Sequence, residues 1–310
     1  MLRRKIHGEI HFRVFRFLKS FPVRPGNLRQ YTPRPLRPEV FPELHAANLP
    51  SIAIVTPSFN QAGFLPQTVG SIVSQNYMPF SYCVMDGGSQ DGSPEVLECL
   101  AAADAFQWCS APDRGQADAI NRGFARVQGD VMAWVNSDDL LLPGSLDFVG
   151  RYFATHPEVD VLYGHRVLID ETGSEIGRWV VPPYFAPGLS YFDYVPQETM
   201  FWRRRVWEEV GGLDESFQFA LDWDLLLRFR EVGARMVRVP YFLGAFRIHP
   251  SQKTNSQIHE VGRREMRRLR NHYGADAAVD RRMINLHNRE LMRAFLTYSL
   301  LRLGIRSEAW

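Results

Sequence analysis

Residues 131–139 read Val-Met-Ala-Trp-Val-Asn-Ser-Asp-Asp, an apolar run that ends at two adjacent carboxylates. The first five residues are all apolar and include β-branched and aromatic side chains, which predicts a strand covered on both faces of a sheet. Ligands of open α/β sheets bind outside the carboxyl ends of the strands, where Asp138 and Asp139 fall. Two interpretations stay open for this pair: ligands of a divalent cation, or a cap on a helix that begins near Pro143.

The composition fits one large domain with appended segments, since 310 residues with 45% hydrophobic content can bury a full core. Residues 1–50 carry ten Lys and Arg against three Asp and Glu, and residues 260–310 carry eleven against six. The whole chain has a net charge of only +2, so its middle is acidic. Basic ends suit nucleic acid or an anionic membrane. No nucleic-acid-binding motif is present, so we expect a membrane surface or ordinary solvated helix faces.

Several features predict a cytoplasmic chain that is soluble or bound peripherally to the inner face of the membrane. The three cysteines lack CxxC spacing and lie in apolar segments, as reduced core residues do. Arg13, Arg16 and Lys19 interrupt the only early apolar segment, so we expect no secretory signal. Residues 51–85 carry no charge, but their frequent Gln, Asn, Ser, Gly and Pro are unsuited to a membrane span.

The chain divides into an arm at 1–50, a domain at 51–255 and a C-terminal helical extension at 256–310. Apolar residues at helical spacing between Ile6 and Phe21 indicate a basic amphipathic helix, which either lies on a membrane or docks on the domain. Frequent prolines after it predict an extended linker. The helices expected in the extension would pack on the domain or mediate oligomer formation.

Strands and helices alternate in the first half of the domain. This order predicts an α/β fold with a Rossmann-like, mostly parallel sheet flanked by helices. The second half is less regular, with a long functional loop at 179–195. The expected strands are 51–56, 80–85, 106–109, 131–135, 159–163, 166–169 and 241–248, and the expected helices of the first half are 63–75, 94–103 and one opened by the segment 112–121.

The loop Asp86-Gly-Gly-Ser-Gln-Asp-Gly92 lets backbone approach a ligand while its acids accept hydrogen bonds. It is no calcium loop, because Gly88 and Gln90 stand where oxygen ligands are needed. Its glycine spacing also differs from a dinucleotide fingerprint. The chemistry of this loop therefore stays open from its residues alone.

Four motifs in this order resemble glycosyltransferase family 2, the inverting nucleotide-sugar enzymes with the GT-A fold. They are Thr56-Pro-Ser-Phe-Asn60, the 86–92 loop, Asp113-Arg-Gly-Gln-Ala-Asp-Ala-Ile-Asn121 and Asn136-Ser-Asp-Asp139. The resemblance covers about residues 51–250. It implies a nucleotide-diphosphate sugar donor, Mg²⁺ or Mn²⁺, and a glycan or lipid-linked acceptor in bacterial cell-envelope polysaccharide or glycolipid synthesis.

The resemblance also implies site residues. The metal would be held by Asp139, with Asp138 beside it and His249 nearby. Many family members have an acid that contacts the base where this chain has Gly87, so that contact must come from elsewhere here. The implied donor-nucleotide residues are Thr56, Pro57, Phe59, Asn60, Asp86, Asp91, Arg114, Asp118, Asn121, Ser137 and Asp138.

The acceptor side is expected to include Gln197, Glu198 and Trp223. Asp222 matches the catalytic base of the family, although Leu221 replaces the usual acid before it, and the alternative for Asp222 is a helix N-cap. Asp224 cannot share a helix face with Asp222, so we interpret it as a structural partner of an Arg or of a backbone amide. Two other functions stay open: a catalytically silent scaffold and a sugar nucleotidyltransferase, although the latter lacks its Gly-rich, Lys/Arg-bearing loop.

Overall fold

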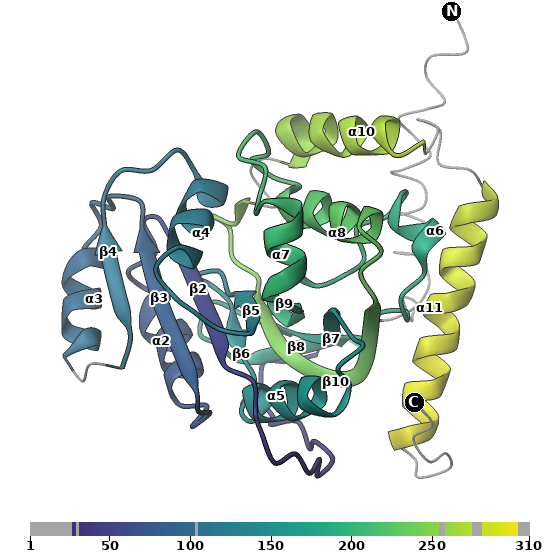
Figure 1. Cartoon of the computed structure of the whole chain (residues 1–310), viewed down its shortest axis with the longest axis horizontal. Coiled ribbons are helices and arrows are strands. Elements are labelled where there is room, and N and C mark those ends of the chain that lie inside the picture. Colours follow the sequence, from purple (N-terminus) through teal and green to yellow (C-terminus); the bar gives the residue numbers. More distant parts are fainter. Residues whose placement is uncertain (1–26, 29–30, 103–104, 254–257, 275–280, 303–310) are drawn as a thin grey trace, which may run out of the picture.

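The computed structural model describes residues 27–28, 31–102, 105–253, 258–274 and 281–302. The amphipathic helix expected between residues 3 and 21 lies outside these ranges. The described strands form one curved sheet that carries helices on both faces (Figure 1). The predicted α/β class with flanking helices is confirmed.

Four parallel strands make the first half of the sheet, in the order β5-β2-β3-β4. All seven residues of β2 are buried, because helices cover both faces of the sheet at this strand. The predicted alternation of strands and helices is confirmed here. The elements are β2 Ile52–Ser58, α2 Leu65–Val73, β3 Phe80–Asp86, α3 Ser93–Ala101, β4 Gln107–Ser110, α4 Gln116–Phe124 and β5 Val131–Trp134.

The second half of the sheet is mixed, where mostly parallel pairing was expected. β9 (Phe201–Arg203) runs antiparallel to β5 and connects the two halves. β7 (Val161–Ile169) pairs antiparallel with β8 (Glu175–Trp179) and β9, and parallel with β10 (Met236–Arg247). The two strands expected at 159–163 and 166–169 are this single strand, because Gly164 permits close approach of β10: a Cβ there would lie 2.6 Å from the Tyr241 carbonyl oxygen.

The remaining elements cover the two faces and one end of the sheet. Residues of α2, α3 and α5 pack on one face, and those of α4, α7 and α8 on the other. None of the helices in the described ranges combines the length and apolar character needed to span a membrane. The remaining bounds are β1 Asn27–Leu28, β6 Leu140–Leu141, α5 Ser145–Thr155, α6 Ala186–Leu189, a 3-10 turn Gln197–Thr199, α7 Arg204–Val210, α8 Leu221–Glu231, a π-helical turn Ile258–Gly262, α10 Arg263–His272 and α11 Arg281–Arg302.

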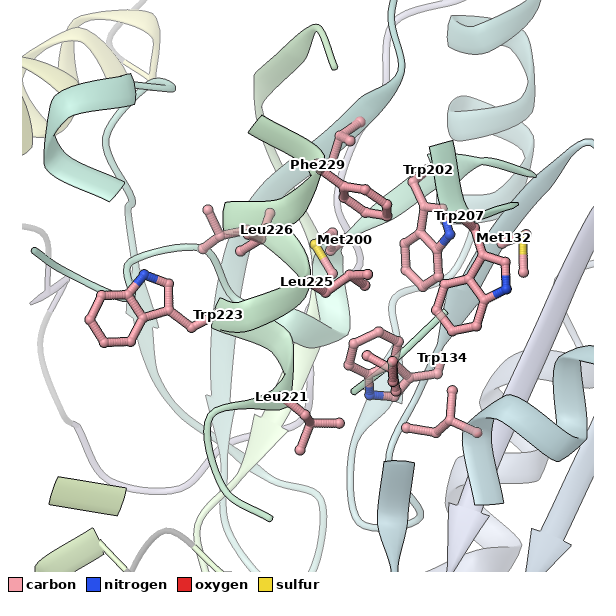
Figure 2. Packing of buried hydrophobic residues seen from close by; sticks show 14 of the residues in the cluster. Met132, Trp134, Met200, Trp202, Trp207, Leu221, Trp223, Leu225, Leu226 and Phe229 are labelled. Carbon is pink, nitrogen blue, oxygen red and sulfur yellow. The ribbon is translucent and has the colours of Figure 1, made fainter. Parts of the chain in front are cut away.

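An aromatic core joins the two halves of the molecule (Figure 2). The indole rings of Trp134 on β5 and Trp202 on β9 meet edge to face, with 5.4 Å between ring centroids. Trp202 also contacts Trp207 of α7 and Phe229 of α8. Large aromatic side chains bury much apolar area, so this core fixes α8 against the strand that precedes the acid pair.

Both ends of the described chain pack on the second half of the sheet. The arm pairs through β1 with β8, and the fully buried Glu175 accepts hydrogen bonds from Arg34 and Arg178. Tyr298 of α11 packs edge to face on Phe242 of β10, 5.5 Å between ring centroids. The two ends are thus integrated with the sheet wherever they are described.

Candidate active site

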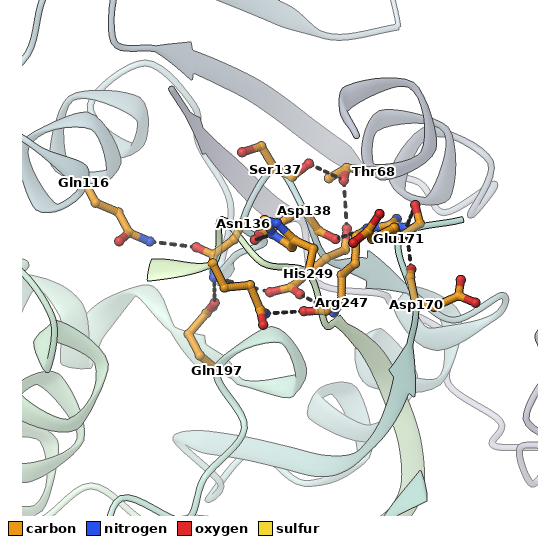
Figure 3. Close-up of polar contacts among 12 residues, drawn as sticks. Thr68, Gln116, Asn136, Ser137, Asp138, Asp170, Glu171, Gln197, Arg247 and His249 are labelled. Atoms are coloured by element: carbon orange, nitrogen blue, oxygen red, sulfur yellow. Dashed lines mark hydrogen bonds and ion pairs between the residues drawn. The ribbon is translucent and has the colours of Figure 1, made fainter. Parts of the chain in front are cut away.

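The acid pair lies in a tight loop directly after β5 (Figure 3). The amide of Asp139 donates to the carbonyl of Asn136 at 3.0 Å, which closes the turn. The hydroxyl of Thr68 on α2 donates to the carbonyls of Ser137 and Asp139 at 2.7 and 2.9 Å. Helix α5 begins only at Ser145 with Gly144 as its N-cap, so neither acid caps it.

The two carboxylates have different environments. Asp139 is 1% exposed, and its oxygens accept from the amide of Arg247 at 3.0 Å and from the Asn136 side chain at 3.3 Å. Burial and the charges of Asp138 and Glu198 raise the pKa of Asp139 well above its ordinary value. The Asp138 side chain is 21% exposed, and its Oδ2 lies 3.0 Å from Nε2 of His249. Asp138 is therefore the more accessible of the two carboxylates, and Asp139 is the more buried one.

Arg247, at the end of β10, holds this loop in place. Its side chain is fully buried, and Nε donates to the carbonyl of Asp138 at 2.7 Å. Its other guanidinium nitrogens donate to the carbonyls of Asp170 and Glu171 and to the side chain of Gln67. Arg247 was not predicted from the sequence, although an arginine that ends a largely apolar strand is a signal of a buried polar role.

A divalent cation fits the donors at this position. Asp138 supplies a carboxylate oxygen and His249 an imidazole nitrogen, and the two atoms lie side by side. In the part of the chain that the structure describes, no group of three or more His, Cys, Asp or Glu side chains could hold a metal. Mg²⁺ and Mn²⁺ often use only one or two protein ligands and take the others from phosphates and water. The site thus suits a cation that is bound together with a phosphorylated ligand.

A chain of side-chain amides connects the acid loop to its neighbours (Figure 3). Lys253 donates to Oε1 of Gln116 at 2.7 Å, and Nε2 of Gln116 donates to Oδ1 of Asn136 at 2.7 Å. Asn136 in turn donates to Oε1 of Gln197 at 3.0 Å, and Gln197 donates to the carbonyl of Trp134 at 2.7 Å. Gln197, expected on the acceptor side, therefore contacts the acid loop directly. Gln116 and Lys253 were not assigned from the sequence.

Asp222 lies in the first turn of α8 and is partly exposed. The N-cap of α8 is Ala220, so Asp222 does not have the N-cap role that was its alternative. Burial raises the pKa of the Asp222 carboxyl, although the charges of Arg166 and Lys253 act in the opposite direction. The exposed Asp193, which the sequence did not single out, lies close enough to Asp222 for the two carboxylates to repel each other.

The other residues expected around Asp222 are buried. Asp224 is 5% exposed and accepts from Nε of Arg228 at 2.8 Å, which confirms the predicted arginine partner. Glu198 is 1% exposed and is paired with Arg166, whose Nε donates to it at 2.8 Å. Trp223 is fully buried, and its indole nitrogen donates to the carbonyl of Leu189 at 2.7 Å. Glu198 and Trp223 thus have almost no exposed surface that an acceptor could contact.

Several residues expected to bind the nucleotide stabilise the loops after β2 and β3. Thr56 is buried and accepts from the hydroxyl of Tyr82 at 3.0 Å, and Pro57 is buried in the same strand. Asp86 accepts from the amide of Ser89 at 2.9 Å, and also from the amide of Gly88 and the hydroxyl of Ser110. Asp91 accepts from the amides of Ala62 and Ser93 at 2.9 and 3.1 Å. These contacts give the loops a fixed shape.

The motif at the start of α4 has both exposed and internal members. Asp118 accepts from Arg114 at 2.8 Å, and the guanidinium of Arg114 also pairs with Glu215 while its side chain stays 75% exposed. Asn121 exchanges two hydrogen bonds with the backbone of Leu213, at 2.9 and 3.0 Å. This contact joins α4 to the turn before α8.

Phe59 and Asn60 lie at the open end of β2. Phe59 is 61% exposed, and Asn60, whose φ is +54°, exchanges hydrogen bonds with Ser89 and Gln90. Of the predicted donor residues, those with accessible side chains are Phe59, Asn60, Asp91, Arg114, Asn121 and Asp138.

A parallel first half, an acid loop at its carboxyl edge and a mixed second half together define the GT-A fold. The fold is shared with S. aureus TarS 1-349 in complex with UDP-GlcNAc, at a TM-score of 0.58 and 15% identity over 81% of this chain and 72% of that one. A mannosyltransferase from Pyrobaculum calidifontis in complex with GDP-Man and Mn²⁺ gives a TM-score of 0.56 at 14% identity, over 97% of this chain and 84% of that one. Residues 53–204 match the model of glycosyl transferase family 2, and the chain belongs to this family.

Among curated relatives, the O-antigen biosynthesis protein RfbC of Myxococcus xanthus is 30% identical over 188 residues, which are 59% of this chain and 14% of that protein. This chain spans only 14–20% of the length of the first three curated relatives that it matches. The family and the fold are therefore shared over one domain of much longer proteins.

Proposed function

We propose that this protein is an inverting glycosyltransferase that moves a sugar from a nucleotide-diphosphate donor to an acceptor hydroxyl. One observation carries the proposal. The partly exposed Asp138 and the buried His249 lie next to Asn136, at one end of the polar chain Asn136-Gln116-Lys253, and the charge of Lys253 acts on the partly exposed Asp222 at the other end. This arrangement supports a donor-side cation site and an acceptor-side base within one connected site.

Asp138 and His249 would hold the divalent cation, which supplies positive charge to the leaving diphosphate when it is bound. Lys253 and the exposed guanidinium of Arg114 add protein charges for the phosphates. Asp222 accepts the proton of the acceptor hydroxyl. At the same time the hydroxyl oxygen forms a bond to the anomeric carbon of the sugar, and the bond from that carbon to the diphosphate breaks. Its raised pKa suits a base that works near neutral pH.

The relatives support a role in cell-envelope glycan synthesis. RfbC is described as an O-antigen biosynthesis protein, and TarS and the Pyrobaculum calidifontis enzyme were crystallised with nucleotide sugars. We therefore include a glycan or lipid-linked acceptor in the proposal. The arginines exposed on α10 favour a position on an anionic membrane surface. Binding to acidic vesicles that falls steeply with salt would support this position, and equal binding to neutral vesicles would contradict it.

The function is tested by thermal shift with UDP, GDP and dTDP, with and without Mn²⁺, followed by assays of product release from sugar nucleotides. We expect at least one nucleotide diphosphate to raise the melting temperature, and to do so more strongly with Mn²⁺. Release of the nucleotide diphosphate identifies a glycosyltransferase. A sugar nucleotidyltransferase would leave the sugar nucleotide intact and would instead release pyrophosphate from a nucleoside triphosphate and a sugar 1-phosphate. A catalytically silent scaffold would release neither product.

A further inference from the structure

A carboxylate outside the predicted site lies over the bare backbone of the loop after β3. A Cβ built on Gly87 would lie 2.7 Å from Oδ2 of Asp113 and 3.3 Å from the ring of Phe59. Oδ1 of Asp113 accepts from the amide of Gly115 at 2.9 Å, so Oδ2 is the oxygen directed at Gly87. Phe59 and Asp113 come from different loops, and atoms of both lie close to the position that a side chain of residue 87 would occupy.

The surroundings of this position are well fixed. The amide of Gly87 donates to the carbonyl of Ser58 at 2.8 Å, which joins the ends of β2 and β3. Asn60 and Ser89 connect the two loops again through a hydrogen bond of 2.7 Å. Phe59 nevertheless remains 61% exposed, which is unusual for a phenylalanine within such an ordered loop. An exposed aromatic ring, a carboxylate oxygen and bare backbone thus lie close together at the carboxyl edge of the parallel strands.

A planar heterocycle with apolar faces and an N–H on its edge fits these three features. Its face would stack on Phe59, and the N–H would donate to Oδ2 of Asp113. Uracil, thymine and guanine carry a ring N–H on the Watson–Crick edge, whereas cytosine and adenine present a ring nitrogen acceptor there. A ring nitrogen that only accepts hydrogen bonds is repelled by a carboxylate, so Asp113 would discriminate between these two groups of bases.

We propose that Asp113 reads the nucleobase of the donor and selects bases that carry a ring N–H. This inference rests on the proposed function and specifies the donor class of the same site. It also assigns Gly87 a role, because any side chain at residue 87 would displace the Asp113 carboxylate. The backbone of Gly87 is not in the left-handed region, so its lack of a side chain is needed for space and not for conformation.

The test measures dissociation constants of UDP, GDP, CDP and ADP in the presence of Mn²⁺ by titration calorimetry. Wild type should bind UDP or GDP at least about tenfold more tightly than CDP and ADP, since a charge-assisted hydrogen bond is replaced by repulsion. In Asp113→Asn the amide oxygen must still face Gly115, which directs the NH₂ group at the base. In this variant the preference for UDP or GDP over CDP and ADP, expressed as the ratio of their dissociation constants, should therefore fall by about tenfold, and CDP should bind more tightly than to wild type.

Three further variants separate the causes. Gly87→Ala should reduce the preference for UDP or GDP over CDP and ADP, because it displaces the Asp113 carboxylate without changing its charge. Phe59→Ala should weaken all four nucleotides alike and leave the ratio unchanged. Glu98→Gln, on the exposed side of α3, also removes one negative charge and should match wild type.

The outcomes are distinguishable. Loss of the base preference in Asp113→Asn with retained nucleotide binding supports the proposal. An unchanged preference in that variant, or a wild type that prefers CDP or ADP, overturns it and leaves the proposed function standing. A wild type that binds no nucleotide diphosphate overturns both.

Discussion

Two neighbouring acids of α8 provide a matched pair of substitutions. Asp222→Asn removes a partly exposed carboxylate from the site, and Asp224→Asn removes a buried carboxylate two residues away. Both changes conserve shape and remove one negative charge from the same turn. Only the position of the charge differs, so the pair separates catalysis from stability.

The expected magnitudes follow from the contacts. Asp224→Asn leaves the charge of Arg228 without its partner, and breaking a buried ion pair costs about 3–5 kcal/mol. Arg228 keeps hydrogen bonds to the carbonyls of Gly212 and Val210 at 2.6 and 3.1 Å, so we expect a value near about 3 kcal/mol. Asp222 makes no such pair, and removal of a general base typically slows transfer by about 10²–10⁴-fold.

The assays are urea unfolding for stability, calorimetry for nucleotide affinity and nucleotide diphosphate release for transfer. Asp222→Asn should keep wild-type stability and donor affinity while its rate falls by at least about 10²-fold. Asp224→Asn should lose stability and keep most of its rate at a temperature where it remains folded. If Asp224→Asn were the inactive and stable variant, the assignment of the base to Asp222 would be wrong.

Three further predictions concern the metal, the arm and the C-terminal helix. Asp138→Asn should abolish the gain in nucleotide affinity that Mn²⁺ produces, and an undiminished Mn²⁺ response in calorimetry would contradict its role as a ligand. Although burial alone would raise it, hydrogen bonds chiefly from Arg178 lower the pKa of Glu175 to about 2, so its carboxylate stabilises the fold above about pH 4.5 and loses this effect as the pH falls toward 2. Glu175→Gln should therefore cost about 3 kcal/mol in urea unfolding at pH 7 and less at pH 3, and an equal cost at both would count against the shift. Burial lowers the pKa of His287, which stacks on Phe192, to about 4, so the attachment of α11 should weaken as the pH falls from 6.5 toward 4; faster hydrogen exchange in α11 at pH 5 than at pH 7, corrected for intrinsic rates and absent in His287→Phe, would show this.

The first half of the fold could be predicted because each signal there is local. Largely apolar runs form β2 and β3, of seven residues each, and β5, of four, and the helices between them begin and end close to the predicted residues. The acid pair was placed correctly at the end of β5 because polar residues after a buried strand must lie at the sheet edge. The second half depends on long-range pairing, and its short strands β8 and β9 carry too few residues to show a period.

Within the site, the direction in which each side chain points could not be predicted from the sequence. Asp138 and Asp139 are chemically identical neighbours, and only the position of Arg247, more than a hundred residues later, turns one inward and leaves the other accessible. Trp223 was expected near the acceptor, but it packs in the core because its indole nitrogen finds the carbonyl of Leu189. Asp113 was part of a recognised motif, yet its approach to Gly87 depends on how two loops fold together.

The same long-range packing explains how the two carboxylates of the proposed reaction keep a fixed separation. Asp138 follows β5 and Asp222 begins α8, and neither lies on a mobile connection between them. Trp134 of β5 contacts Trp202, and Trp202 contacts Phe229 of α8, so one buried aromatic cluster fixes both elements (Figure 2). Truncation of a buried Trp costs about 3–5 kcal/mol, and here it would also loosen the distance between metal ligand and base. The cluster is therefore expected to affect the rate as well as the stability, even though every ring in it is buried.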